Sequence, residues 1–332
     1  MHSSSQGGTV TTFTDLLSQL RLPVVGSPMF IASGPELVKA QCQAGIVGSF
    51  PSLNARPASQ LTDWLDEITE SNAAHTEADP QHPAAPFAVN LIVHRSNNRL
   101  EEDLAEVVRH QVPIVITSLG AREEVNEAVH SYGGVVLHDV INNRFANKAV
   151  EKGADGVIAV AAGAGGHAGA QSPFALVQEI RSWFDGPLLL SGAIAHGRSI
   201  LAALAAGADL AYVGSAFLST PEANVVDDYR QMIVESGADD VVYSNYFTGV
   251  KGNYLRGSIV ASGLDPDDLP DADPTKMDFS SAPGSDSKAW RDIWGSGQGI
   301  GALGQQRTTA KLVETFAVQY EVAQQELKSR LG

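Results

Sequence analysis

The chain has 332 residues, of which 43% are hydrophobic and 18% charged, with a formal net charge of −16. This composition excludes a disordered chain, and so acidic a surface argues against nucleic acid and anionic membrane lipids as partners. No stretch reaches about 20 apolar residues and no basic-then-apolar leader is visible, so we expect no membrane span and a cytoplasmic protein. The single cysteine, Cys42, excludes an internal disulfide, and the scattered histidines predict no metal site.

From residue 24 onward, short β-branched runs alternate with longer helical segments. Most of the strand runs are nearly continuous apolar stretches, which is typical of parallel strands buried on both faces. Strands are expected at 24–29, 46–50, 87–93, 113–119, 135–141, 156–161, 187–192 and 211–217. Helices are expected at 34–45, 58–71, 97–111, 121–133, 142–153, 172–184, 197–207 and 220–237, several of which end on glycine.

Eight consecutive βα units predict an α/β fold, a (β/α)8 TIM barrel, over residues 20–235. A doubly wound open sheet is the alternative. Residues 236–332 break the pattern, because two glycine-bearing stretches flank an acidic Pro/Asp segment and a last helix is expected at 307–331. We expect this segment to be an appended C-terminal helical lid that packs on the barrel mouth and contributes to the same site.

Polar and glycine residues collect at the carboxyl ends of the expected strands. In a barrel these ends meet at one face, which is where active sites lie. Glycine-bearing turns after the seventh and eighth strands commonly hold a phosphate through backbone N–H groups. Gly192-Ala193 and Gly214-Ser215 are therefore candidate phosphate turns, whereas the lack of GxGxxG after the first strand argues against a dinucleotide fold.

The loop VAAGAGGHAGA, residues 160–170, surrounds a single histidine with glycine and alanine. These residues bury little apolar area, so we expect a ligand to approach their backbone closely. His167 is then either a reagent that faces this ligand or a polar cap.

The segments PMFIASGPELV, FAVNLIV, AGAGGHAG, LLLSGAIAHGRS, GADLAYVGSAFL and WGSGQGIG together resemble the nitronate monooxygenase family, formerly called 2-nitropropane dioxygenases, over residues 23–304. The resemblance implies FMN at the barrel mouth, with its phosphate on the turns of Gly192, Ala193, Gly214 and Ser215. It also implies that the flavin ring lies near strand-end and lid residues, and the implied contacts are Pro28, Met29, Asn90, Gly166, Ser191 and Gln298. His138 is either a further contact to FMN or substrate, or a hydrogen-bonded histidine at a strand end.

In that family the histidine of the GGH segment faces the substrate, which implies that His167 is a base or an anion contact. The implied reaction is the oxidation of an alkyl nitronate, or of a nitroalkane, by FMN and O2 to a carbonyl compound and nitrite. The first alternative is an FMN-dependent NAD(P)H reductase of the enoyl-acyl-carrier-protein or quinone reductase type, and a flavin-carrying protein without turnover is another.

This chain also departs from some relatives. They carry an acidic residue before the glycine-rich loop and a lysine late in the fifth strand, where this chain has Ala/Gly and His138-Asp139. Lys251 and Arg256 either attract an anionic substrate or are ordinary loop cations. The sequence leaves a monomer and a homodimer both open.

Overall fold

The structure is a computed structural model that describes residues 13–272 and 292–332; the N-terminal residues used in the expectation of a cytoplasmic protein lie outside this range. Its centre is a parallel eight-stranded sheet in the order β1-β9-β8-β6-β5-β4-β3-β2. The strands are β1 (Val24–Gly26), β2 (Gly48–Pro51), β3 (Phe87–Ile92), β4 (Ile114–Ser118), β5 (Val135–Val140), β6 (Gly156–Val160), β8 (Leu188–Ser191) and β9 (Leu210–Val213).

The sheet closes into a barrel where β1 meets β2. Val25 and Val47 form a parallel bridge, the Gly26 N–H donates to the Val47 carbonyl at 2.8 Å, and the Val47 N–H donates to the Val24 carbonyl at 3.1 Å. An open sheet would leave both of these edges unpaired. The predicted TIM barrel is therefore confirmed, and the doubly wound alternative is wrong.

Side chains alternate along each strand between the barrel interior and the helix-covered outside. The interior is filled by a buried cluster that includes Val25, Ile116, Leu137, Leu189 and Tyr212. Helix α1 (Phe13–Ser18) covers the lower end of this interior, because Phe13 and Leu17 pack against the cluster. The upper end, at the strands' carboxyl termini, stays available for a ligand.

Seven helices follow their strands around the barrel: α2 (Pro35–Gln43), α3 (Gln60–Ala78), α4 (Leu100–Arg109), α5 (Glu123–His130), α6 (Asn143–Glu151), α7 (Pro173–Arg181) and α8 (Gly197–Ala206). Their ends are locally encoded. Asn142 caps α6 by accepting from the Phe145 N–H at 3.0 Å, and Gly207 ends α8 at a φ of 114°, which favours glycine.

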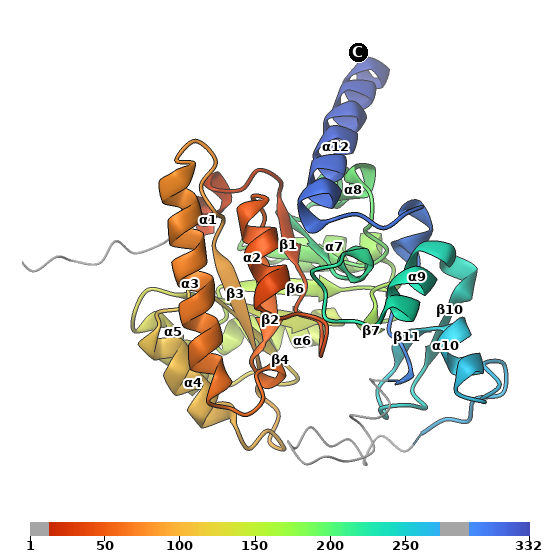
Figure 1. Cartoon of the computed structure of the whole chain (residues 1–332), viewed down its shortest axis with the longest axis horizontal. Helices are drawn as coiled ribbons and strands as arrows, with labels where there is room; N and C mark the ends of the chain where they lie inside the picture. The colour runs from red at the N-terminus through yellow and green to blue at the C-terminus, as the bar shows by residue number, and fades with distance from the viewer. Residues whose placement is uncertain (1–12, 273–291) are drawn as a thin grey trace, which may run out of the picture.

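The eighth helical position on the barrel is taken by the C-terminal helix. Helix α12 (Thr309–Leu331) packs against both α8 and α2, and Figure 1 shows it next to α8. The helix that directly follows β9 is displaced: η2 (Ser215–Ser219) and α9 (Asp227–Glu235) pack on each other and on η5 (Gln298–Ala302). Residues 236–332 were expected to pack on the barrel mouth, whereas their last helix, α12, packs on the helices at the side of the barrel.

The rest of the appended segment contains strands as well as helices. Strands β10 (Val241–Ser244) and β11 (Gly252–Leu255) form an antiparallel sheet with β7 (Gly166–His167), which belongs to the loop after β6. Helix α10 (Arg256–Ala261) follows, and Tyr254, Ile259 and Ile293 form a small core of their own. The expected lid is thus a mixed α/β layer tied to the glycine-rich loop. Among the described residues, no helix is both long and apolar enough to cross a membrane.

Candidate active site

A cavity of about 960 Å³ opens at the carboxyl ends of the barrel strands. Its wall contains eleven of the twelve residues that the sequence analysis named for catalysis and cofactor binding, which are Pro28, Met29, Asn90, His138, Gly166, His167, Ser191, Gly192, Ala193, Gly214 and Ser215. Gln298 lies directly behind the wall, where its Oε1 would be 3.0 Å from a Cβ placed on Gly163. The barrel therefore brings the expected residues together at one face.

The two turns after β8 and β9 present unpaired backbone donors to this cavity. In the described part of the chain, the N–H groups of Gly192, Gly214 and Ser215 donate to no other group. The Ala193 N–H differs, because it already donates to the Gly163 carbonyl at 3.1 Å. Three free N–H groups on adjacent turns suit an anion such as a phosphate.

The start of helix α8 does not contribute to these donors. The Gly197 N–H donates to Gln319 Oε1 of α12 at 2.9 Å, and the Arg198 N–H donates to His196 Nδ1 at 3.0 Å. The candidate anion site consequently rests on the two turns alone.

The Gly163 carbonyl is one of several contacts that join the appended segment to the glycine-rich loop and its neighbours. The Gly163 carbonyl accepts from both the Ala193 N–H and the Gln298 N–H, the latter at 2.9 Å. Ser215 Oγ accepts from the Gly297 N–H at 2.8 Å. A Cβ on Gly165 would lie 2.7 Å from both the Gly297 nitrogen and Ser215 Oγ, so the loop needs glycine there for this close approach.

His167 is held between the barrel and the lid. It lies on β7, which pairs with β11 through Gly252, and its Nε2 lies 3.0 Å from Thr248 Oγ1. Thr248 Oγ1 also donates to the Val250 carbonyl at 3.1 Å, so this hydroxyl links the ring to the β10–β11 connection. Burial lowers the pKa of His167 to about 4, so the ring is neutral at pH 7. Thr248 was missed by the sequence analysis because it lies 81 residues away and carries no motif.

A chain of polar side chains lies on the inward faces of β3, β4 and β5. Asn90 Nδ2 donates to Ser118 Oγ at 2.8 Å, and Ser118 Oγ donates to Asp139 Oδ2. Burial raises the pKa of Asp139 to about 6, against the lowering effect of the Ser118 hydrogen bond. Asp139 follows the interior residue Leu137 by two positions, and this alternation in the sequence was a signal that it points inward.

His138 faces the opposite way from Asp139. Its strand neighbours Val136 and Val140 pack in the cluster outside the barrel, and its Nδ1 lies 2.6 Å from Thr117 Oγ1. Burial lowers the pKa of His138 to about 4. His138 also belongs to the cavity wall, so both roles that the sequence left open for it stay predictions.

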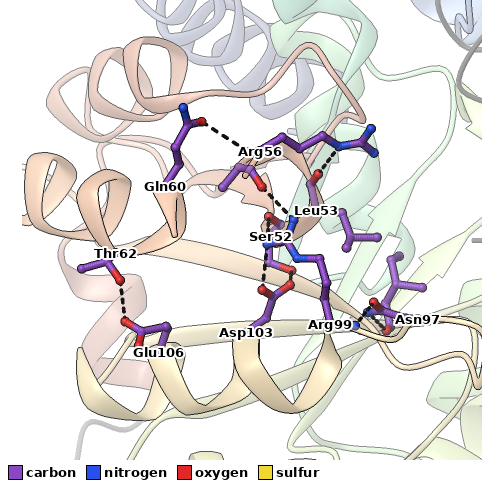
Figure 2. A network of polar contacts seen from close by, with 11 residues as sticks. Ser52, Leu53, Arg56, Gln60, Thr62, Asn97, Arg99, Asp103 and Glu106 are labelled. Atoms are coloured by element: carbon purple, nitrogen blue, oxygen red, sulfur yellow. Dashed lines mark hydrogen bonds and ion pairs between the residues drawn. The ribbon is translucent and has the colours of Figure 1, made fainter. Parts of the chain in front are cut away.

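The rim on the β2 and β3 side is held by a buried ion pair (Figure 2). Asp103 accepts from Arg99 Nη2 at 2.8 Å and from Ser52 Oγ at 2.7 Å, and Arg99 Nη1 donates to the Ala55 carbonyl at 2.7 Å. These bonds fix the loop that carries Leu53 and Arg56 into the cavity wall.

Two cations that the sequence analysis singled out have other contacts. Arg256 forms two hydrogen bonds to the Asp267 carboxylate, at 2.9 and 3.0 Å, and Lys251 Nζ lies 5.7 Å from the centre of the Tyr243 ring. In residues 13–272 and 292–332, no three His, Cys, Asp or Glu side chains gather as a metal ion would need.

The sequence model of the nitronate monooxygenase family matches residues 12–315. The chain belongs to the nitronate monooxygenase family. A nitronate monooxygenase of Paraburkholderia phytofirmans is 26% identical over 278 residues, which cover 74% of this chain and 76% of that protein. In Rhodococcus jostii, the (3aS,4S,5R,7aS)-5-hydroxy-7a-methyl-1-oxo-octahydro-1H-indene-4-carboxyl-CoA dehydrogenase is 27% identical over 252 residues, with 76% and 67% covered.

A solved nitroalkane oxidase from Streptomyces ansochromogenes superposes with a TM-score of 0.76 at 22% identity, covering 94% of this chain and 99% of that one. At this identity the likeness shows the shared barrel fold. With the family match, the chain is a flavin-dependent oxidoreductase of the nitronate monooxygenase type that acts on a small molecule.

Proposed function

We propose that this chain binds FMN across the barrel mouth and oxidises alkyl nitronates with O2 to carbonyl compounds and nitrite. The observation that carries the proposal is the placement of the glycine turns and His167 on the wall of one cavity. FMN, when bound, would accept electrons from the nitronate and pass them to O2. Pro28, Met29, Asn90, Gly166, Ser191 and Gln298 would surround it.

The residues present fit a flavin mononucleotide. The free N–H groups of Gly192, Gly214 and Ser215 would hold the phosphate. Ala193 would line this site without donating to the phosphate, because its N–H already donates to the Gly163 carbonyl. Gly192 has a φ of 142°, and a Cβ there would lie 2.7 Å from the Ala162 carbonyl oxygen, so the turn requires glycine to present its N–H. The cavity is within the usual size range of cofactor sites.

His167 would contact the substrate, and its neutral state defines what it can do. A neutral ring can hydrogen-bond to a nitronate oxygen or accept a proton from carbon, but it does not offer a full positive charge at pH 7. Binding of an anionic nitronate beside it would raise its pKa, since an opposite charge favours the protonated ring. The neutral ring therefore suits two roles, a hydrogen bond to a nitronate oxygen or removal of a proton from the carbon of a nitroalkane.

The test is nitrite formation from ethyl nitronate with matched variants. His167→Ala should keep its flavin and lose about 100-fold or more in kcat/KM, the usual contribution of one acid–base or anion contact. Tyr243→Phe, which removes a hydroxyl bonded to the Ala168 carbonyl beyond His167, serves as the control and should keep most activity. Full activity in His167→Ala would overturn the assigned role.

An FMN-dependent reductase that uses NAD(P)H, of the enoyl-acyl-carrier-protein or quinone reductase type, is the second candidate. The observation in its favour is an exposed apolar ledge, by which we mean the patch formed by Ile141 and Phe145 on the cavity wall. These side chains are 40% and 44% exposed, and the cation Lys148 lines the same wall. Such a ledge suits a larger anionic ligand with a planar or apolar part, such as a nicotinamide dinucleotide or an acyl thioester. The relative from Rhodococcus jostii, named as a carboxyl-CoA dehydrogenase, agrees with a ligand of that size. Rapid bleaching of the bound flavin by NADH or NADPH would favour this candidate.

A further inference from the structure

The Asn90–Ser118–Asp139 chain is a directed set of hydrogen bonds at the floor of the cavity. The amide of Asn90 donates to Ser118, whose own proton is donated to Asp139, so the chain ends on a carboxylate. Asn90 and Ser118 are buried, at 4% and 6% exposure, whereas Asp139 is partly exposed and lines the cavity. The carboxylate is therefore the most exposed member of this chain, and all three side chains belong to residues of the same cavity wall.

Two members of this chain lie opposite the candidate phosphate turns, and Asp139 lies between the two sides. In the ring of eight strands, β3 and β4 stand four places from β8 and β9, respectively, whereas β5, which carries Asp139, stands two places from β8 and three from β9. A ligand anchored at Gly192 and Gly214 that extends across the mouth therefore reaches the side of Asn90 and Ser118 and passes Asp139. A flavin anchored by its phosphate has this extended form.

Asp139 has an apolar neighbour on the next strand. In the described part of the chain it forms no ion pair, and its β6 neighbour in register is Ile158. Tyr212 of β9 is close enough that the Asp139 charge helps to raise its pKa, while His138 points to the other side of β5. The other titratable or charged side chains on this cavity wall are Arg56, His94, Lys148, His167 and Tyr229.

We propose that Asp139 takes up one proton when the flavin bound in this cavity is reduced. Two-electron reduction with one proton leaves the flavin with one added negative charge, which would stand close to a second anion on Asp139. Protonation of the carboxylate (CO2− + H+ → CO2H) removes this repulsion, and the electrons come from the reductant, which is dithionite in the test below. The inference rests on the proposed flavin binding.

The carboxyl is suited to this exchange near neutral pH. Its pKa is already raised to about 6 by burial, and a nearby negative charge on the reduced flavin would raise it further. Between these two pKa values, reduction takes up one proton more than the flavin needs by itself. The potential should then change with pH by an additional 29.6 mV per tenfold change in proton concentration, since the couple transfers two electrons.

The test is the midpoint potential of the flavin in the purified holoprotein from pH 5.5 to 8.5, by stepwise dithionite reduction beside a reference dye. The wild type should show the steeper slope over part of this range. Asp139→Asn keeps the shape and the acceptor for Ser118 but cannot titrate, so it should show the slope of the flavin proton alone. Ser118→Ala removes the hydrogen bond that lowers the pKa of the Asp139 carboxyl. In this variant the pH range over which the midpoint potential has the steeper slope should therefore begin at higher pH.

The outcomes separate this inference from the proposed function. A holoprotein without flavin absorbance would refute the proposed cofactor. A flavin-bearing wild type with the same slope as Asp139→Asn would refute the proton uptake alone, because a merely structural Asp139 changes flavin affinity and not the slope. If Asp139→Asn loses its flavin, the comparison of wild type with Ser118→Ala decides, and an unmoved steep range there would overturn the inference.

Discussion

Removal of the Asp103 carboxylate should destabilise the protein far more than loss of an ordinary surface ion pair. The side chains of Arg99 and Asp103 are only 10% and 1% exposed, and both carboxylate oxygens are used (Figure 2). Asp103→Ala would leave the Arg99 guanidinium buried without its counter-ion, which costs about 3–5 kcal/mol. The double variant Arg99→Met/Asp103→Leu removes both charges and should cost less than the single one.

Urea unfolding at pH 7 measures these free energies of unfolding directly. The control is Thr62→Val, which removes the hydroxyl that donates to Glu106 at 2.8 Å near the other end of the same helix and should cost about 1 kcal/mol. The reasoning is refuted if Asp103→Ala costs no more than Thr62→Val, or if the double variant is less stable than Asp103→Ala. The first result would mean that water or a new hydrogen-bond partner replaces the Asp103 carboxylate beside the Arg99 guanidinium.

Three further predictions concern the site. Gly192→Ala should weaken FMN binding at least tenfold in a fluorescence titration of the apoprotein, because a φ of 142° and the Ala162 carbonyl oxygen at 2.7 Å both oppose a Cβ there. The control is Gly263→Ala, which is also at positive φ but has no atom within 4 Å of the added Cβ and should not weaken binding. Equal losses of affinity in the two variants would contradict this. Thr248→Val should lower kcat about tenfold with flavin content unchanged, since the His167 ring loses its Nε2 partner, and an unchanged kcat would show that the ring is fixed otherwise. Burial lowers the pKa of His138 from 6.5 to about 4, so His138 contributes to stability above pH 6.5 and this contribution is lost as the pH falls through 4. The free energy of unfolding should fall by about 3 kcal/mol over this range because of His138. Between pH 7 and 4 the free energy of unfolding should therefore fall less in His138→Asn than in the wild type, and parallel curves would contradict the assignment.

Much of the barrel could be predicted from the sequence because each of its strands is a local signal. Runs such as Gly156–Val160 are continuously apolar, and the helices between the strands carry their own caps and glycine stops. Strands β10 and β11 were missed, since they are four residues long and contain glycine or polar residues that acquire strand structure only by pairing with the loop of His167. Local pattern cannot reveal a pairing of that kind.

The position of α12 was missed for a similar reason. Its sequence predicts a helix, and the structure has one at Thr309–Leu331, but the place where it packs depends on the displacement of α9 away from the barrel side. In the site, too, some features could be predicted from the sequence and others could not. Strand-end residues such as Asn90 could be placed at the mouth by topology, whereas the pairing of His167 with Thr248 depends on tertiary contacts between distant segments.

The central claim is tested most directly by the visible spectrum of the purified protein under anaerobic conditions, before and after addition of ethyl nitronate and, separately, of NADH. The account predicts a bound flavin whose absorbance changes rapidly with the nitronate and only slowly with NADH. A flavin that ignores the nitronate but is bleached by NADH would contradict the proposed reaction and establish the reductase, and a spectrum without flavin would contradict the proposed cofactor.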